Sequence, residues 1–243
     1  MRVQRIPPAT VARLPIYAQS LKALAAAGVR LASSNRLAEA AGVEAPQIRR
    51  DLACLGAFGT PGVGYDVEAL LNEISKHLGL SSTWPVALVG PARLSPLFLS
   101  YLGVFEHNFR ILAIFDNDAA RAGTRFGDLE VMPTALITPV VKSLGIGIAI
   151  IASPPPLAQE AADKLVLGGV TSILSLGATP PVVPSGVAIR SINLAAEMLI
   201  LSFHETMKRS SVARWTPRPA MRRVVWHGQK GKSLCGSPTW FES

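Results

Sequence analysis

The chain has 243 residues, of which 49% are hydrophobic and 16% charged; this excludes a mini-protein and a disordered chain and leaves room for one or two globular domains. Its 24 Lys and Arg against 16 Asp and Glu give a formal net charge of +8, which favours an anionic partner. The excess lies at the two ends, because residues 1–50 carry +6 and residues 208–243 carry +7, whereas residues 51–80 carry −3 and residues 81–207 carry −2. This distribution argues against a nucleic-acid surface over the whole protein.

Three helices are predicted at the start of the chain. Residues 10–27 have apolar side chains at helical spacing, with an early break at Pro15. A second helix follows the capping residues 33–35 and ends at Gly42. A third, over residues 46–55, carries apolar residues at i, i+4 and i+7. Two short helices joined by a glycine-containing turn indicate a helix-turn-helix.

A winged form of this motif is predicted by the segment that follows. Residues 56–65 contain four glycines and a proline, a composition that is too broken for a helix and fits a β-hairpin wing. Residues 66–78 return to helical periodicity, and residues 79–85 have the character of a linker. We therefore expect residues 1–80 to form a winged helix-turn-helix DNA-binding domain.

The remainder of the chain predicts an α/β fold. Four short apolar runs are typical of strands buried on both faces of a parallel sheet: residues 86–90, 110–116, 147–153 and 171–177. Segments of helix length separate them, so we expect a Rossmann-like, doubly wound parallel sheet over residues 84–193. A mostly apolar helix is predicted over residues 194–208, and the basic, aperiodic residues 209–243 are expected to be a disordered tail.

The third helix is the candidate for reading DNA. In ideal helical geometry its apolar residues face the core, Arg50 points away from them, and Gln47 and Arg49 lie on the flanks. Arg pairs with guanine and Gln with adenine in the major groove. Phosphate contacts are expected from Lys22, Arg30 and Arg36. The alternative is the solvated basic face of an ordinary helical domain.

A candidate dinucleotide loop follows the first strand of the α/β part. It reads Gly90, Pro91, Ala92, Arg93, Leu94 and Ser95, and it keeps only the first glycine of the G-x-G-x-x-G pattern. Asp116 ends the next strand, 26 residues after Gly90, where an acidic residue would bind the adenosine ribose of NAD. The alternatives are a plain strand-to-helix turn and an Asp that merely opens the turn at residues 116–118.

No catalytic or metal-binding constellation is predicted. The four histidines have no spacing that links them to a nucleophile. Ser153 ends a strand where α/β ligand sites gather, but a serine at such a position is more often a helix cap, which is what we expect. Cys54 and Cys235 are far apart without a CxxC pair, which argues against a disulfide and a zinc site. The longest apolar run is nine residues, so we expect a soluble, cytoplasmic protein without a membrane span.

Several motifs together resemble the Rex family of redox-sensing transcriptional repressors: RLPIYAQSLKAL, LAEAAGVEAPQIRRDLACLGAFGTPGVGY, LVGPARLSPLFLSYLGVF, IFDNDAARAG and ASPPPLAQEAAD. The resemblance spans about residues 7–207. It implies a winged helix that binds operator DNA, a Rossmann domain that binds NAD(H), and a C-terminal helix exchanged between the subunits of a homodimer. It further implies that Gln47, Arg49 and Arg50 face DNA, that residues 90–95 and Asp116 bind the dinucleotide, and that Tyr101 lies near the nicotinamide.

Several positions depart from the family pattern. Pro61 replaces a wing arginine, Glu44 replaces the threonine cap of the third helix, and Gln19 and Asn193 replace an inter-domain Arg–Asp pair. With the missing glycines, these changes predict a DNA-binding repressor whose response to NADH is weakened or lost. The alternatives are an α/β nucleotide- or CoA-binding enzyme with an accessory helical domain, and an interaction module that binds neither ligand.

Overall fold

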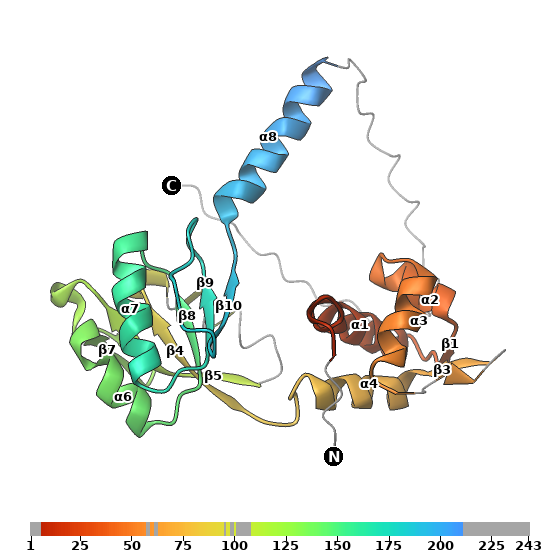
Figure 1. Ribbon diagram of the computed structural model, residues 1–243, viewed down its shortest axis with the longest axis horizontal. Helices are drawn as coiled ribbons and strands as arrows, with labels where there is room; N and C mark the ends of the chain where they lie inside the picture. The colour runs from red at the N-terminus through yellow and green to blue at the C-terminus, as the bar shows by residue number, and fades with distance from the viewer. Residues whose placement is uncertain are drawn as a thin grey trace, which may run out of the picture. The chain divides into compact units, whose positions relative to one another are not determined.

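The computed structural model describes residues 6–56, 59–60, 63–94, 96–97, 100 and 108–210. Figure 1 shows a helical N-terminal region (residues 6–78), a sheet region (residues 84–191) and a long helix that follows the sheet. Buried apolar residues form one cluster in the N-terminal region and two others in the sheet region. Each region therefore has its own core.

The N-terminal region contains, in chain order, α1 (Pro8–Ala26), β1 (Leu31–Ala32), α2 (Ser34–Ala41), α3 (Ala45–Ala53), β2 (Gly59–Thr60), β3 (Gly64–Asp66) and α4 (Val67–His77). Helix α1 continues through Pro15, so the predicted early break is wrong. Pro15 removes one backbone hydrogen bond, but Leu14, Tyr17 and Leu21 on either side of it are buried in one core, which keeps the helix continuous.

The predicted helix-turn-helix is present as α2 and α3. The side-chain oxygen of Ser33 accepts a hydrogen bond from the Arg36 amide at 3.2 Å and caps α2, which ends at Gly42 in a left-handed conformation with φ of 66°. Helix α3 begins after Glu44, whose side chain makes no capping hydrogen bond. Helix α3 therefore depends on its buried face rather than on its cap.

Strands β1, β3 and β2 form a small antiparallel sheet in that order, so the predicted wing hairpin is present. Its position 61, where Pro61 replaces an arginine, lies outside the described residues. Gly64 in β3 has φ of 106°, and a Cβ there would lie 2.6 Å from the Ala32 carbonyl oxygen in β1. Only glycine fits so close to the neighbouring backbone.

The sheet region confirms the α/β fold class. Its strands are β4 (Trp84–Val89), β5 (Phe109–Asp116), β6 (Arg125–Phe126), β7 (Leu129–Pro133), β8 (Ile148–Ile151), β9 (Ser172–Ser175) and β10 (Ala188–Ser191). They lie in the order β10-β9-β8-β4-β5-β7-β6, and all neighbours are parallel except β6 and β7. The short strands β6, β7 and β10 were not predicted from the sequence.

The central strands are buried on both faces, as the continuous apolar runs predicted. On one face, Ala87 and Val89 of β4 pack with α6 (Ile137–Ser143) and α7 (Pro155–Leu167). On the other face, Val86 and Leu88 pack with residues of β5, β7 and β8. The chain leaves β4 on one side for β5 and returns on the other side as β8, so a topological switch point lies at the carboxyl ends of these strands.

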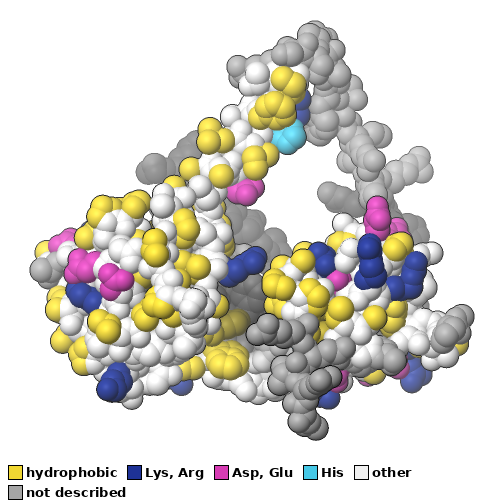
Figure 2. Space-filling model, viewed as in Figure 1, with side chains coloured by type: hydrophobic (Ala, Val, Ile, Leu, Met, Phe, Trp, Pro, Cys, Tyr) yellow, Lys and Arg dark blue, Asp and Glu magenta, His cyan; other side chains and the backbone are white. Residues whose placement is uncertain are grey.

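Helix α8 (Leu194–Ser210) follows β10. Its exposed apolar side chains are between 48% and 69% exposed, and Figure 2 shows such side chains along the helix: Leu194, Met198, Leu199, Ile200, Leu201, Phe203 and Met207. Within the part of the chain that the structure describes, no helix has the length and apolar character needed to span a membrane. The segment predicted to be a disordered tail lies outside the described residues from position 211 onward.

The close approach of β3 to β1 generates a stability prediction. Gly64→Ala should lower the free energy of unfolding of the N-terminal region by roughly 2–4 kcal/mol, because the new Cβ adds a backbone clash to an unfavourable φ. Gly42→Ala is the matched control, because a Cβ there meets no atom within 4 Å, and it should cost about 1 kcal/mol. Urea unfolding followed by circular dichroism measures both; equal costs would contradict the clash.

Candidate functional site

The outer face of α3 carries two arginines. Ile48 and Leu52 are 0% and 2% exposed, and Arg49 and Arg50 lie on the exposed side, as helical geometry predicted. Arg49 Nη1 donates a hydrogen bond to Ser34 Oγ at 2.9 Å, which ties α3 to the first turn of α2. The two arginines are therefore presented on the outside of the helix-turn-helix.

The side chain of Gln47 is held at both ends. Its Nε2 donates to Asp51 Oδ1 at 2.9 Å, and its Oε1 accepts from Arg50 Nη2 at 3.2 Å. These bonds fix which end of the amide donates and which accepts, and each end keeps one hydrogen-bonding position. Gln47 therefore connects the exposed Arg50 to a buried carboxylate.

That carboxylate belongs to Asp51, which is 2% exposed. Its two oxygens accept hydrogen bonds from Thr10 Oγ1 (2.9 Å), Arg13 Nε (2.6 Å), Arg13 Nη2 (2.8 Å), Tyr17 Oη (2.7 Å) and Gln47 Nε2 (2.9 Å). Thr10, Arg13 and Tyr17 all come from α1. The Asp51 carboxylate therefore joins α1 to α3, the candidate helix for reading DNA.

The hydrogen bonds determine the charge state of this cluster. Burial by itself would raise the pKa of Asp51, but the hydrogen bonds from Arg13, Tyr17, Thr10 and Gln47 outweigh it and hold the pKa well below its usual range. Burial, followed by the hydrogen bond to Asp51, raises the pKa of Tyr17 to about 12. Asp51 is therefore ionised and Tyr17 neutral at physiological pH.

The Asp51 cluster was not predicted from the sequence, although two signals were present. An aspartate stands between Ile48 and Leu52 on the apolar face of α3, where a lone charge requires partners. Thr10, Arg13 and Tyr17 recur at helical spacing beside the apolar residues of α1. An aspartate on the buried face of one helix and polar side chains on the buried face of another together indicate that the two helices are joined by buried hydrogen bonds.

The residues predicted to contact phosphate lie on separate elements. Lys22 is half-buried on α1, Arg30 is exposed just before β1, and Arg36 is exposed in the first turn of α2. Figure 2 shows several Lys and Arg side chains gathered on the part of the N-terminal region that α2 and α3 form. The helix-turn-helix thus combines an arginine-bearing helix with neighbouring positive charge.

A cavity of about 370 Å³ lies at the switch point of the sheet. It is lined by the loops after β4, β5 and β8: Pro91, Arg93, Asp116, Asn117, Asp118, Arg121, Ser153, Pro154 and Leu157. This is where open α/β sheets bind their ligands. Three predicted dinucleotide-site residues therefore line the same cavity, namely Pro91, Arg93 and Asp116.

Asp116 holds the loop that follows β4. Its Oδ2 accepts a hydrogen bond from the Ala92 amide at 2.7 Å, and its Oδ1 accepts one from the Asp118 amide at 2.9 Å. The side chain is 7% exposed, and Arg121 Nε lies 3.9 Å from its Oδ2. Glycine is favoured at position 90, because φ is 151° and a Cβ there would lie 3.0 Å from the Cβ of Ala152. Much of the loop geometry therefore comes from contacts inside the protein.

The prediction that Ser153 caps a helix is wrong. The cap position of α7 is taken by Pro154, and the Ser153 hydroxyl is buried at the cavity without a hydrogen-bond partner among the described residues. A cap at Ser153 would start the helix at Pro154, whereas α7 starts one residue later, at Pro155. Two predicted site residues, Ser95 and Tyr101, lie outside the described residues.

Two further sequence predictions concern cysteine and metal. Cys54 is half-buried at the end of α3, and its Sγ donates a hydrogen bond to the Arg50 carbonyl oxygen at 3.4 Å. In the ranges that the structure describes, no three His, Cys, Asp or Glu side chains are grouped so that they could hold a metal ion.

Comparison with known families matches both regions of the chain. The family described as "Putative DNA-binding protein N-terminus" matches residues 5–53, and that described as "CoA binding domain" matches residues 81–178. Among solved structures, RSP in complex with β-NAD+ and operator DNA has a TM-score of 0.77 at 31% identity, covering 86% of this chain and 99% of that one. RSP in complex with β-NADH has a TM-score of 0.74 at 30% identity, covering 84% and 96%.

Two curated relatives with the same name are similar over most of the chain. The chain is 44% identical to the redox-sensing transcriptional repressor Rex of Streptomyces griseus subsp. griseus, over 91% of this chain and 88% of the relative. It is 37% identical to Rex of Pelotomaculum thermopropionicum, over 86% of this chain and 99% of the relative. The chain therefore belongs to the Rex family of redox-sensing transcriptional repressors.

Proposed function

We propose that this chain is a homodimeric repressor that binds double-stranded operator DNA through α3 and NAD(H) at the cavity beside Asp116, and that it is a regulator rather than an enzyme. The observation that carries the proposal is the orientation of α3, which buries Ile48 and Leu52 and presents Arg49 and Arg50 outward. As a regulator that binds DNA, the chain would act in the cytoplasm. The similar solved structures of RSP with β-NAD+ and operator DNA and with β-NADH support both ligands.

The proposed organisation has four parts. They are a winged helix-turn-helix over residues 1–80, a dinucleotide-binding domain over residues 84–193, a dimerisation helix over residues 194–208, and a basic tail over residues 209–243. Separate cores in the first two parts support the division. The apolar side chains exposed on α8 support a partner subunit, because single soluble chains rarely expose so many together.

On DNA, the two α3 helices of a dimer would read half-sites of a pseudo-palindrome about one helical turn apart. Arg50 would bind a guanine, and Gln47, with its amide orientation fixed, would bind a base edge through its remaining hydrogen and lone pair. Arg49, Lys22, Arg30 and Arg36 would bind phosphates, which set the register.

At the cavity, the carboxylate of Asp116 would accept a hydrogen bond from the adenosine ribose and favour NAD(H) over its 2′-phosphorylated form. Residues 90–95 would lie at the diphosphate, and Tyr101 near the nicotinamide. Because the loop lacks two glycines of the usual pattern, the response to NADH would be weaker than in relatives that keep them.

Arg50→Ala should weaken operator binding about ten- to a hundredfold and relax the preference at one base pair, because a bidentate arginine–guanine contact is lost. Fluorescence anisotropy with operator and scrambled duplexes at fixed salt measures this. Arg36→Ala is the comparison, because loss of a phosphate contact should weaken binding to both duplexes alike and lower the salt slope by about one. Unchanged base preference in Arg50→Ala would contradict the role of Arg50.

Titration of NADH and NAD+ against the protein–operator complex tests the sensing part of the proposal. NADH should release the operator only at concentrations of about 1 μM or more, because residues 90–94 offer few free backbone donors to its diphosphate. Isothermal titration and anisotropy report binding and release separately. Release at sub-micromolar NADH would show that the response is not weakened, and coenzyme A serves as the control ligand.

Acid unfolding tests the Asp51 cluster. The pKa of Asp51 is depressed in the folded state, so its stabilisation is fully present above the ordinary Asp pKa of about 3.9 and is lost as the pH falls below that value. Between about pH 4 and pH 2, wild type should take up one more proton on unfolding than Asp51→Asn does. Thermal unfolding at a series of pH values measures this, and equal pH slopes would contradict the assignment.

A further inference from the structure

Within residues 90–94, the described start of the loop after β4, almost no backbone amide is left for a phosphate. The Gly90 amide donates to the Phe115 carbonyl oxygen at 3.0 Å, and the Leu94 amide donates to the Pro91 carbonyl oxygen at 2.9 Å. The Ala92 amide donates to Asp116, and Pro91 has no amide hydrogen. Of the five residues 90–94, only Arg93 has an amide that none of these bonds uses. Residues 90–94 therefore do not offer the usual set of backbone donors to a diphosphate.

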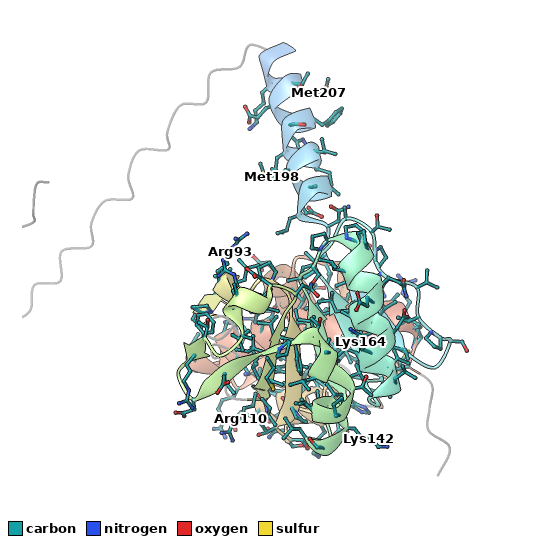
Figure 3. The ribbon with its side chains drawn as sticks, turned by 90° about the vertical axis from the view of Figure 1, so that its left-hand side faces the viewer. Arg93, Arg110, Lys142, Lys164, Met198 and Met207 are labelled. Atoms are coloured by element: carbon teal, nitrogen blue, oxygen red, sulfur yellow. The ribbon has the colours of Figure 1, made fainter. Side chains whose placement is uncertain are left out.

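Two arginines line the cavity, and they differ in their surroundings. Arg121 Nε lies 3.2 Å from Asp118 Oδ2 and 3.9 Å from Asp116 Oδ2, so its charge is already balanced. Arg93 is exposed and makes no ion pair or side-chain hydrogen bond with any residue that the structure describes. Figure 3 shows Arg93 at one end of the sheet region and Arg110 at the other. Arg93 is thus the cation at the cavity that remains available to an anion.

Ser153 points to a ligand independently of these charges. It is 4% exposed, it lines the same cavity from the end of β8, and its hydroxyl has no partner among the described residues. A buried hydroxyl without a partner is costly, and a bound acceptor would remove that cost. A phosphate oxygen is such an acceptor.

We propose that Arg93 and Ser153 bind the diphosphate of the dinucleotide with their side chains, in place of the amides of a glycine-rich loop. The inference rests on the proposed binding of NAD(H) at this cavity. A guanidinium matches two phosphate oxygens at once, and the serine hydroxyl donates one hydrogen bond. Recognition of this kind is ionic, so the affinity depends on salt and on the charge of the diphosphate.

The test is NADH binding to the full-length protein by isothermal titration at two salt concentrations. Arg93→Ala should raise the Kd about ten- to a hundredfold and flatten its salt dependence. Arg93→Lys should recover part of the lost affinity, because lysine keeps the positive charge but lacks the paired N–H donors of a guanidinium. Ser153→Ala should raise the Kd several-fold, with the salt dependence unchanged.

Arg110→Ala is the matched control, because it removes the same charge at the opposite end of the sheet and should leave the Kd unchanged. If wild type binds NADH and Arg93→Ala binds it as tightly as Arg110→Ala does, the inference is overturned while the proposed function stands. If wild type binds no NADH or NAD+, the NAD(H) part of the proposed function and the inference both fail. Circular dichroism of each variant confirms that the fold is intact.

Discussion

The buried carboxylate of Asp51 holds the N-terminal region together around one charge. Three side chains of α1 and one of α3 donate to it, so the first helix and the helix that presents Arg49 and Arg50 form a single rigid unit. An ionised group in a core is stable only when its hydrogen-bonding positions are filled, and here they are. The same set of bonds reaches the surface through Gln47 and ends at Arg50, whose side chain is thereby oriented. In the proposed contact of Arg50 with DNA, less conformational entropy would then be lost on binding.

The elements with strong side-chain periodicity could be predicted from the sequence. The apolar pattern of the helices around Gly42 and of strands β4, β5, β8 and β9 lies in consecutive residues, so a short stretch of sequence is enough to predict each element. Strands β6 and β10 lie at the two edges of the sheet, and β7 lies next to β6. Apart from Val131 of β7, their residues are half-buried or exposed, so they lack a continuous apolar pattern. Pro15 was misjudged because tertiary packing on both sides of it outweighs one lost hydrogen bond.

The site could be predicted only in part, for a related reason. The partners of Asp51 on α1 are 34 to 41 residues away in the sequence, so no local spacing reveals the cluster. The sequence neighbours of Ser153 predicted a helix cap, whereas the structure places Pro154 at the cap and buries the Ser153 hydroxyl without a partner among the described residues. The glycine pattern pointed to the loop after β4, which does line the cavity at the switch point. It did not reveal that the amides of Gly90, Ala92 and Leu94 are already bonded within the protein.

Asp116 has two places in the structure at once. Its carboxylate accepts the Ala92 and Asp118 amides and so shapes the loops on both sides of the cavity, and it also faces the cavity itself. A replacement of Asp116 would therefore remove the hydrogen bonds of both loops in one step. Under the proposed role of Asp116 at the ribose, a mutation that admitted a 2′-phosphate would also disturb these loops, so a change of cofactor would require compensating loop mutations.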